Sequence, residues 1–311
     1  MPTSKVEKIV ELAELSEKLG YERCWIYDEG LHTRDVFVTL TSIAIATKKI
    51  LVGPGITNPY VRHPGITASA IASLDEVSNG RSFIGLGAGG GLTLNPLGIE
   101  RLKPVTTVSE TVVALRGLFS GERVDLEGNE FSLKSASLNY GRENIEIFLA
   151  GRGKRMTQLG AELGDGFYLS YINKDFLPGH LKSLRNAAKR DPFKIVYSTM
   201  IVSSQKEFEE ARAALSFRLV DSPQEVKDHI GMTEEINNQI KTALSEGGPS
   251  NAAKYVPSEW VEQFVITGSS SEASEELMSL FDENGIDEFQ LPIGNPEEAE
   301  KVISRTSKMF N

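Results

Sequence analysis

The fold is decided by residues 51–91, which read LVGPGITNPYVRHPGITASAIASLDEVSNGRSFIGLGAGGG. The short apolar runs Ile50–Gly53 and Ser82–Leu86 are typical of buried strands, and residues 64–78 between them have the composition of a helix. Asn79–Gly80 ends that helix, because both residues tolerate the left-handed backbone of a helix terminus. A strand, a helix and a second strand predict a parallel pair joined by a right-handed crossover.

The same alternation continues on both sides of this unit. The strand runs are continuous and apolar, as expected when helices cover both faces of a parallel sheet, and their count predicts an α/β fold, a TIM-like (β/α)8 barrel. Further helices are expected over 4–19, 36–47, 104–120 and 154–163, after Pro178, and over 271–284 and 296–310. Further strands are expected at Tyr21–Tyr27, Asn144–Ala150, Asp165–Ser170, Phe193–Ser203 and Glu288–Pro292, with a hairpin-like excursion at Gly121–Leu133.

Two segments depart from the regular alternation. Residues 205–260 are charged and largely helical, with a break at 247–251. We interpret them as a helical insertion that caps the barrel mouth within a single domain of residues 1–311; the alternative is a mobile, solvated helical hairpin. At the other end, the chain enters its first helix with no strand before it. Only seven core strands remain if Val261–Thr267 lies outside the barrel. The barrel is therefore expected to lack its usual first strand, through a truncated reading frame or in a relative with altered chemistry.

Composition narrows the class of protein. The chain has 311 residues, 40% hydrophobic composition and a formal net charge of -10, which indicates an acidic enzyme with a large core. It has no basic stripe for nucleic acid, and no apolar run of about 18 residues for a membrane span. A cytoplasmic location is expected. The single cysteine, Cys24, lies in an apolar run and is expected to be buried and inert, and no His and carboxylate cluster has metal spacing.

Two glycine-rich turns follow predicted strands, at residues 87–91 and 151–153. Active sites of parallel barrels gather at the C-terminal ends of the strands. Glycine lets backbone N–H groups approach an anion, and a following helix N-terminus adds partial positive charge. Arg152 and Arg155 could add full charges toward a phosphate. Each turn alone is weak evidence, because glycines also make tight turns, but two on one rim favour a ligand site. A Rossmann fingerprint is not present.

The adjacent acids Asp28 and Glu29 follow the first visible strand and are a candidate catalytic pair. Partial burial would raise one pKa and keep a proton donor available near neutral pH. The alternative is a helix-capping Asp beside a solvated Glu. His63 could contact an anionic ligand or cap a helix, whereas His32 and His180 are expected at the surface.

The run GPGITNPYVRHP at 53–64, with TASAIASLDE at 67–76 and SNGR at 78–81, resembles the bacterial-luciferase-like superfamily. Within it, the chain looks like the methylenetetrahydromethanopterin reductases that use the deazaflavin coenzyme F420. The likeness covers roughly residues 5–204 and 261–311, is most specific in 51–118 and is poor across 205–260. It is extended by LGIE at 97–100, KPV at 103–105, ELGDG at 162–166 and PIG at 292–294.

The resemblance implies a cofactor lying across the barrel mouth, coenzyme F420 or alternatively FMN. It implies a non-proline cis peptide at Gly55–Ile56 against the ring system, with ring contacts from Asp28 and Asn58. The cradle for the phosphate and side chain maps to Ala88, Gly89, Gly151, Arg152, Gly153 and Arg155. Two features depart from the family pattern. Glu29 stands where many members have His, and the catalytic acid that the reductases carry on their first strand has no counterpart here.

The leading hypothesis is an oxidoreductase that transfers a hydride between the deazaflavin and a small-molecule substrate, with a proton from Asp28 or Glu29. An FMN-dependent luciferase-like monooxygenase and a non-catalytic flavin-binding relative are the alternatives. Carbon at ring position five carries hydride, whereas nitrogen there supports oxygen chemistry. The resemblance also implies a homodimer, for which the small-residue helix at 64–77 would suit an interface.

Overall fold

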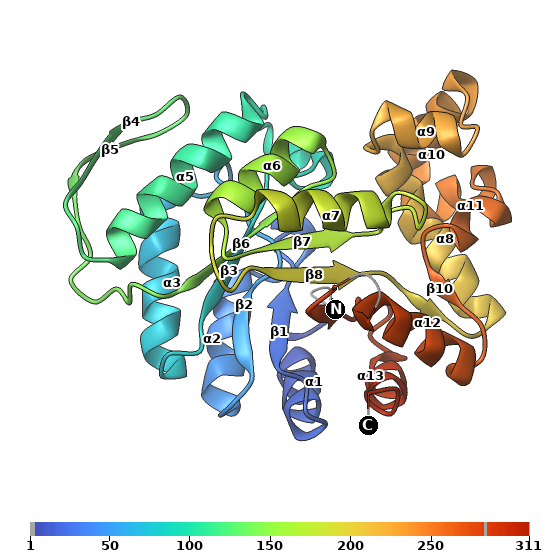
Figure 1. The fold of residues 1–311 in the computed structure, drawn as a ribbon, viewed down its shortest axis with the longest axis horizontal. Helices are drawn as coiled ribbons and strands as arrows, with labels where there is room; N and C mark the ends of the chain where they lie inside the picture. Colours follow the sequence, from blue (N-terminus) through green and yellow to red (C-terminus); the bar gives the residue numbers. More distant parts are fainter. Residues whose placement is uncertain (1–3, 283–284, 311) are drawn as a thin grey trace.

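The computed structural model of the protein describes residues 4–282 and 285–310, and helices alternate with parallel strands along it (Figure 1). Five strands form one sheet in the order β11-β8-β7-β6-β3, and β1 pairs in parallel with β2. Isolated parallel bridges, Val52 to Ser82 and Thr57 to Leu86, connect β2 to β3. The TIM-like α/β barrel expected from the sequence is confirmed. The strands of the ring are β1 (Arg23–Ile26), β2 (Leu51–Pro54), β3 (Phe83–Leu86), β6 (Glu146–Ala150), β7 (Gly166–Ser170), β8 (Lys194–Ser198) and β11 (Glu288–Gln290).

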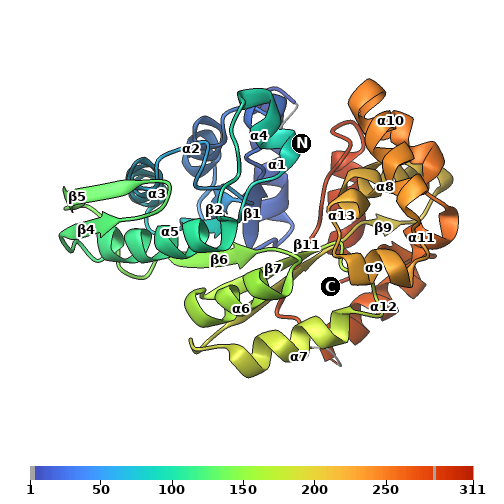
Figure 2. The same cartoon turned by 90° about the horizontal axis from the view of Figure 1, so that it is seen from above.

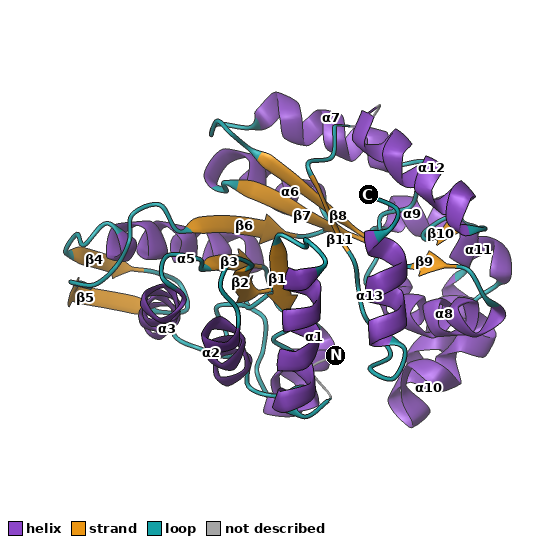
Figure 3. Cartoon of the chain, turned by 90° about the horizontal axis from the view of Figure 1, so that it is seen from below, coloured by secondary structure: helices purple, strands orange, loops and turns teal. Residues whose placement is uncertain are grey.

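Helices cover the outside of these strands (Figure 3). Local sequence sets their ends: Asp35 accepts hydrogen bonds from the N–H groups of Phe37 and Val38 and so caps α2. His63 accepts from Gly65 N at the start of α3, and Asn79 ends that helix in the left-handed conformation with a φ of 59°. The covering helices are α1 (Val6–Lys18), α2 (Val36–Ala46), α3 (Pro64–Ser78), α5 (Pro104–Phe119), α6 (Lys154–Leu163), α7 (Leu177–Ala187), α12 (Ser270–Asp282) and α13 (Ala299–Ser307).

Aromatic side chains fill the interior of the barrel. The ring of Trp25 lies 4.5 Å from that of Phe83, 5.3 Å from that of Phe148 and 5.3 Å from that of Tyr168. The contacts of Trp25 with Phe83 and Phe148 are edge-to-face, a geometry that adds to the free energy gained by burial. The packed interior leaves room for a ligand only above this layer, at the barrel mouth.

A charged network closes the base of the barrel, where the strands begin. Arg23 donates to Glu288 at 2.9 Å and to Glu146 at 2.9 Å, and Lys194 donates to Glu146 at 2.9 Å. The guanidinium of Arg23 also lies 4.6 Å from the ring centroid of Phe83. No backbone ladder joins β1 to β11 in residues 4–282 and 285–310, so the Arg23–Glu288 pair connects the two strands instead. No strand precedes α1 within those residues either.

The segment 205–260 is helical and lies beyond the ends toward which β7 and β8 point (Figures 1 and 2). Its helices pack around a buried apolar cluster that includes Leu215, Ile240 and Trp260 and reaches Tyr171 and Val202 of the barrel. This packing favours a cap over a solvated hairpin, while the division of the chain into one domain with an insertion remains a prediction. The helices are α8 (Gln205–Val220), α9 (Gln224–His229), α10 (Glu234–Ala252) and α11 (Ser258–Glu262). The predicted break is a kink inside α10 at Gly248, whose φ is 71°.

Some predicted boundaries are wrong. The long strand expected at Phe193–Ser203 divides into β8 and β9 (Ile201–Val202), because β9 leaves the main sheet to pair with β10 (Ile266–Thr267). The strand expected from Val261 therefore begins only at Ile266, after α11.

Three further boundaries also differ. The excursion expected at Gly121–Leu133 is the antiparallel hairpin of β4 (Val124–Glu127) and β5 (Ser132–Ala136). The helix expected over 271–284 is α12, and residues 283–284 lie outside the described part. The last helix begins at Ala299 rather than 296, because Asn295 accepts from Glu297 N in a turn. Within the described residues, no helix is both long and apolar enough to cross a membrane.

Candidate functional site

A cavity of about 1300 Å³ opens at the C-terminal ends of the strands. Its walls come from the turns after β1, β2, β3 and β6 and from residues 217–226 at the end of α8 and the start of α9. The structure thus brings every predicted site residue to one cavity, although their roles remain predictions. Those residues are Asp28, Glu29, Gly55, Ile56, Asn58, Ala88, Gly89, Gly151, Arg152, Gly153 and Arg155.

Asp28 lies at the end of β1 and accepts a hydrogen bond from Thr57 Oγ1 at 2.6 Å. Burial raises the pKa of Asp28, and the Thr57 hydroxyl and the charge of Arg62 oppose that rise only in part. The raised pKa expected for one of the two acids is therefore found at Asp28. Asp28 does not cap a helix, since Asp35 caps α2. Glu29 lines the same cavity, and its backbone N–H donates to Thr33 Oγ1.

The peptide bond between Gly55 and Ile56 is cis, as the family resemblance implied. A Cβ at Gly55 would lie 2.6 Å from Trp25 Cβ, so packing against the indole requires glycine there. A Cβ at Gly87 would lie 2.5 Å from Ile56 Cδ1. These two glycines are therefore explained by packing around Trp25 and Ile56, apart from any ligand.

One glycine in each of the two turns, Gly90 and Gly153, faces open space. A Cβ at Gly90 or at Gly153 would meet no atom within 4 Å. Gly153 is the N-cap of α6 and forms no side-chain cap, so the first N–H groups of this helix remain available to an anion. The two turns thus present backbone to the cavity at positions where added side chains would fill its wall.

Asn58 is 3% exposed and lies against Gly89 at the cavity wall. Its side-chain oxygen accepts from the backbone N–H groups of Tyr60 and Val61, at 3.0 and 3.1 Å. The amide nitrogen is the part of the side chain left for a ligand, so the predicted ring contact would be a hydrogen bond that Asn58 donates.

The floor of the cavity holds two hydroxyl groups, of Tyr168 and Ser198, that no sequence motif singles out. Both donate to Gln290 Oε1, at 3.0 Å and 2.5 Å. Gln290 Nε2 donates to the carbonyl of Leu291 at 3.2 Å, which fixes the orientation of the amide. Period-two alternation is the signal that could have found them, because Tyr168 and Ser170 share one face of β7, and Val196 and Ser198 share one face of β8.

Several other lining residues depart from the sequence expectation. His180 was expected at the surface, but it lines the cavity, and burial lowers its pKa. Phe217 and Arg218 come from the segment where the family resemblance fails, so nothing in the pattern indicated them.

Other residues considered from the sequence lie outside the cavity lining. His63 caps α3 and is not among the lining residues, and Asn173 donates to Gln263 at 3.0 Å. Burial raises the pKa of the Cys24 thiol to about 12, in keeping with an inert thiol.

The cavity fits a planar cofactor with a phosphate-bearing tail. Its volume exceeds the range of about 300–1000 Å³ typical of small-molecule sites, which leaves room for a second ligand. The cis bond and Asp28 lie on one side, and the open turn at Gly153 with α6 lies on another. Donors suited to a phosphate and a wide apolar wall therefore occur in the same cavity.

Fold and cavity together define a TIM-like barrel enzyme that binds its ligands at the carboxyl ends of its strands. The sequence profile described as luciferase-like monooxygenase matches residues 1–288. The chain therefore belongs to the luciferase-like monooxygenase family.

Named relatives sharpen this placement. The 5,10-methylenetetrahydromethanopterin reductase of Methanolobus tindarius is 31% identical over 317 residues, covering 98% of this chain and 97% of that protein. The enzyme of the same name from Archaeoglobus fulgidus is 33% identical over 90% of this chain and 88% of its own length. The solved structure of coenzyme F420 dependent tetrahydromethanopterin reductase from Methanopyrus kandleri has a TM-score of 0.85 at 26% identity, covering 99% of this chain and 95% of that one.

Proposed function

We propose that this protein is an oxidoreductase that transfers a hydride between coenzyme F420 and a small-molecule substrate, as a methylenetetrahydromethanopterin reductase. The observation that carries the proposal is one cavity that is lined by Asp28, by Gly55 and Ile56, and by the Gly151–Arg155 turn. Relatives that bear this enzyme name align over nearly the whole chain, which supports the choice within the family.

The residues of the cavity would have separate roles in holding the cofactor, delivering a proton and excluding water. When bound, the deazaflavin supplies the ring carbon that accepts and donates a hydride. Asp28, Ile56 and Asn58 would hold the ring, and the backbone of Ala88, Gly89 and Gly151–Gly153 with Arg155 would hold the tail. Asp28 keeps a proton to a higher pH than an exposed aspartate does, and either it or Glu29 would deliver one. The walls from 217–226 exclude water from the bound substrate.

Cofactor titration tests the proposal most directly. The purified chain is titrated with coenzyme F420 and with FMN, followed by fluorescence, and then assayed anaerobically for oxidation of reduced F420 by methylenetetrahydromethanopterin. We expect F420 to bind at micromolar concentration or tighter, and we expect reduced F420 to be oxidised only when the pterin is present. Binding of FMN alone with oxygen consumption would favour a monooxygenase, and binding of neither would favour a non-catalytic relative.

We also propose that the protein is a homodimer joined through α2 and α3. Val38 and Ile45 on α2, and Ile66 and Val77 on α3, are exposed apolar side chains on adjacent helices. Several large apolar side chains exposed on two adjacent helices are typical of an interface. Light scattering should give twice the chain mass for the wild type and the single-chain mass for Ile45→Glu combined with Ile66→Glu. A cytoplasmic location is likewise a proposal, which cell fractionation would test.

A further inference from the structure

We propose that Arg152 and Arg218 together form a site for an oxyanion, a phosphate or carboxylate group of a ligand in the barrel mouth. The site joins the turn after β6 to the last turn of α8, so the segment 205–260 supplies part of it. The identity of the ligand rests on the proposed function, whereas the oxyanion site itself does not.

The first observation is the position of the two guanidinium groups. Both residues line the cavity, and Arg152 Nη1 donates to the carbonyl oxygen of Arg218 at 2.7 Å. Arg218 lies with its guanidinium 4.0 Å from the ring centroid of Tyr171 and 4.4 Å from that of Phe217. Stacking on two rings restricts the rotamers of Arg218 and holds its charge at the cavity wall.

The second observation is that these charges are not neutralised. Neither Arg152 nor Arg218 forms a salt bridge with any residue that the structure describes. Burial and then the charge of Arg218 lower the pKa of Arg152 to about 10, against the opposing charge of Asp221. Two like charges brought together in a wall of low polarity are unfavourable unless an anion lies between them.

The neighbouring charges do not supply that anion. Lys154 pairs with Glu225 at 2.9 Å, so these two cancel each other. Arg155 adds a further positive charge to the lining, and the carboxylates of Asp28, Glu29 and Asp221 in that lining form no salt bridge with Arg152 or Arg218 among the described residues. Each arginine has five N–H donors. Arg152 uses one for the carbonyl of Arg218, and Arg218 uses one for the carbonyl of Ala214, so donors remain for a bidentate contact.

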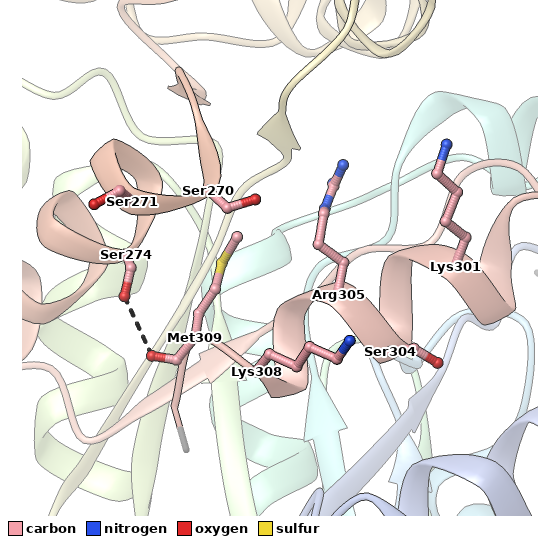
Figure 4. Close-up of a pocket in the computed structure, with 8 residues that line it drawn as sticks. All are labelled: Ser270, Ser271, Ser274, Lys301, Ser304, Arg305, Lys308 and Met309. Atoms are coloured by element: carbon pink, nitrogen blue, oxygen red, sulfur yellow. Dashed lines mark hydrogen bonds between the residues drawn. The ribbon is translucent and has the colours of Figure 1, made fainter.

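A second basic cavity, of about 590 Å³ between α12 and α13, shows the contrast (Figure 4). It presents Lys301, Arg305 and Lys308, but Arg305 pairs with Glu207 at 3.0 Å, and Lys301 lies 3.9 Å from Glu298. Its central charge is already compensated, so no anion is required there. The uncompensated pair in the barrel mouth is the feature that calls for a ligand.

Inorganic phosphate is the first probe. Calorimetric titration of the whole chain with phosphate should show binding that Arg218→Gln and Arg152→Gln each weaken by about 10- to 100-fold, the effect of losing a hydrogen bond to a charged group. Arg212→Gln is the matched control. Arg212 lies on the same helix as Arg218, with its guanidinium 5.5 Å from the ring centroid of Phe208, and it is outside the cavity lining. This variant should leave the phosphate affinity unchanged.

Two further arms identify the source of the oxyanion. If it belongs to the cofactor, Arg218→Gln raises the Kd for F420 but not for the phosphate-free deazariboflavin that forms its ring and ribityl chain. If it belongs to the substrate, the KM for the substrate rises while both cofactor constants stay unchanged. Binding of phosphate without any binding of F420 or FMN would leave this site standing and remove the proposed function.

Unchanged phosphate, cofactor and substrate constants in both glutamine variants, with a lower Tm for Arg152→Gln alone, would overturn the site. Arg152 would then only tie α8 to the barrel. Should the variants fail to fold, the wild type decides the matter. If the wild type binds no phosphate, and binds F420 and the phosphate-free deazariboflavin with equal, salt-independent affinities, the proposed site is also overturned.

Discussion

Both ends of the barrel carry charged side chains within the ring of strands, but only the base neutralises them. At the base, Arg23, Lys194, Glu146 and Glu288 form a closed network of two cations and two anions. At the mouth, Asp28 accepts a hydrogen bond from the neutral hydroxyl of Thr57, and Arg152 donates one to a neutral backbone carbonyl. Parallel barrels separate stability from chemistry in this way, with the bottom face holding the fold and the top face holding the site.

The difference teaches where charge is structural and where it is functional. Burial alone would raise the pKa of Glu146, but Arg23 and Lys194 outweigh it and hold that pKa below its ordinary value. Burial also raises the pKa of Asp28, and there no cation outweighs it. The fold thus favours the charged carboxylate at the base and the protonated carboxyl at the mouth.

Asp28→Asn gives the largest expected effect at the mouth. Loss of a group that donates or positions a proton should lower kcat by about 100- to 10,000-fold. Stability at neutral pH should rise, because the folded state no longer buries a carboxylate there. Steady-state kinetics and urea unfolding measure the two effects. Full activity in this variant would assign the proton to Glu29, which Glu29→Gln then checks.

Arg23→Met gives the largest expected effect at the base. Removing the cation leaves Glu146 and Glu288 with Lys194 alone, and breaking a buried ionic network in this way costs about 3–5 kcal/mol. Urea unfolding measures that loss in the free energy of unfolding. Arg218→Gln at the mouth should change stability by no more than about 1 kcal/mol. Equal losses at the two ends would remove the contrast between them.

The glycines provide a smaller test of the same contrast. Gly153→Val places a side chain in open space at the cavity wall, so it should weaken cofactor binding by about tenfold, or ~1.4 kcal/mol, with stability nearly unchanged. Gly87→Ala brings a Cβ against Ile56, so it should lower Tm first. Fluorescence titration and thermal unfolding of both variants compare them. A Tm loss confined to Gly153→Val would contradict this assignment.

The smallest expected effect is on the pH dependence of stability. The pKa of Glu146 is lowered on folding, so its contribution is present above its ordinary value of 4.5 and is lost as pH falls through the folded value. The pKa of Asp28 is raised, so its contribution is present below 3.8 and is lost as pH rises through the folded value. Glu146→Gln should therefore be less stable than the wild type at neutral pH and approach its stability in acid. Asp28→Asn should become more stable than the wild type as the pH rises toward neutral. Unfolding series across the acid range would show these opposite slopes, and parallel slopes would contradict them.

Local patterns predicted the N-terminal side of the rim well. Asp28 and Gly89 follow short buried strands, and a strand followed by a turn and a helix places the turn at the mouth without further information, whereas Ile56 and Asn58 were indicated by the family resemblance. The division of Phe193–Ser203 into two strands was not predictable. It depends on pairing between β9 and β10, which lie far apart in the chain.

The other side of the rim depends on how 205–260 packs, and that packing has no local signal. Arg218 is one of several basic residues on charged helices, and only the placement of α8 against Tyr171 distinguishes it from Arg212. The role of Gly87 also needed the structure, because a glycine required by a neighbouring side chain looks the same in sequence as one that faces a ligand.

The arrangement around Gln290 has a consequence for what the cavity accepts. The hydroxyl hydrogens of Tyr168 and Ser198 are both committed to one amide oxygen, so each hydroxyl presents only lone pairs to a visitor. A molecule that reaches this depth with N–H or O–H groups satisfies them. One that brings only carbonyl or ether oxygens makes no such hydrogen bond, and the Tyr168 hydroxyl then keeps only its contacts with neighbouring side chains, among them Ser198 and Ser170. The floor of the barrel thus favours ligands that bring hydrogen-bond donors over ligands that bring acceptors alone.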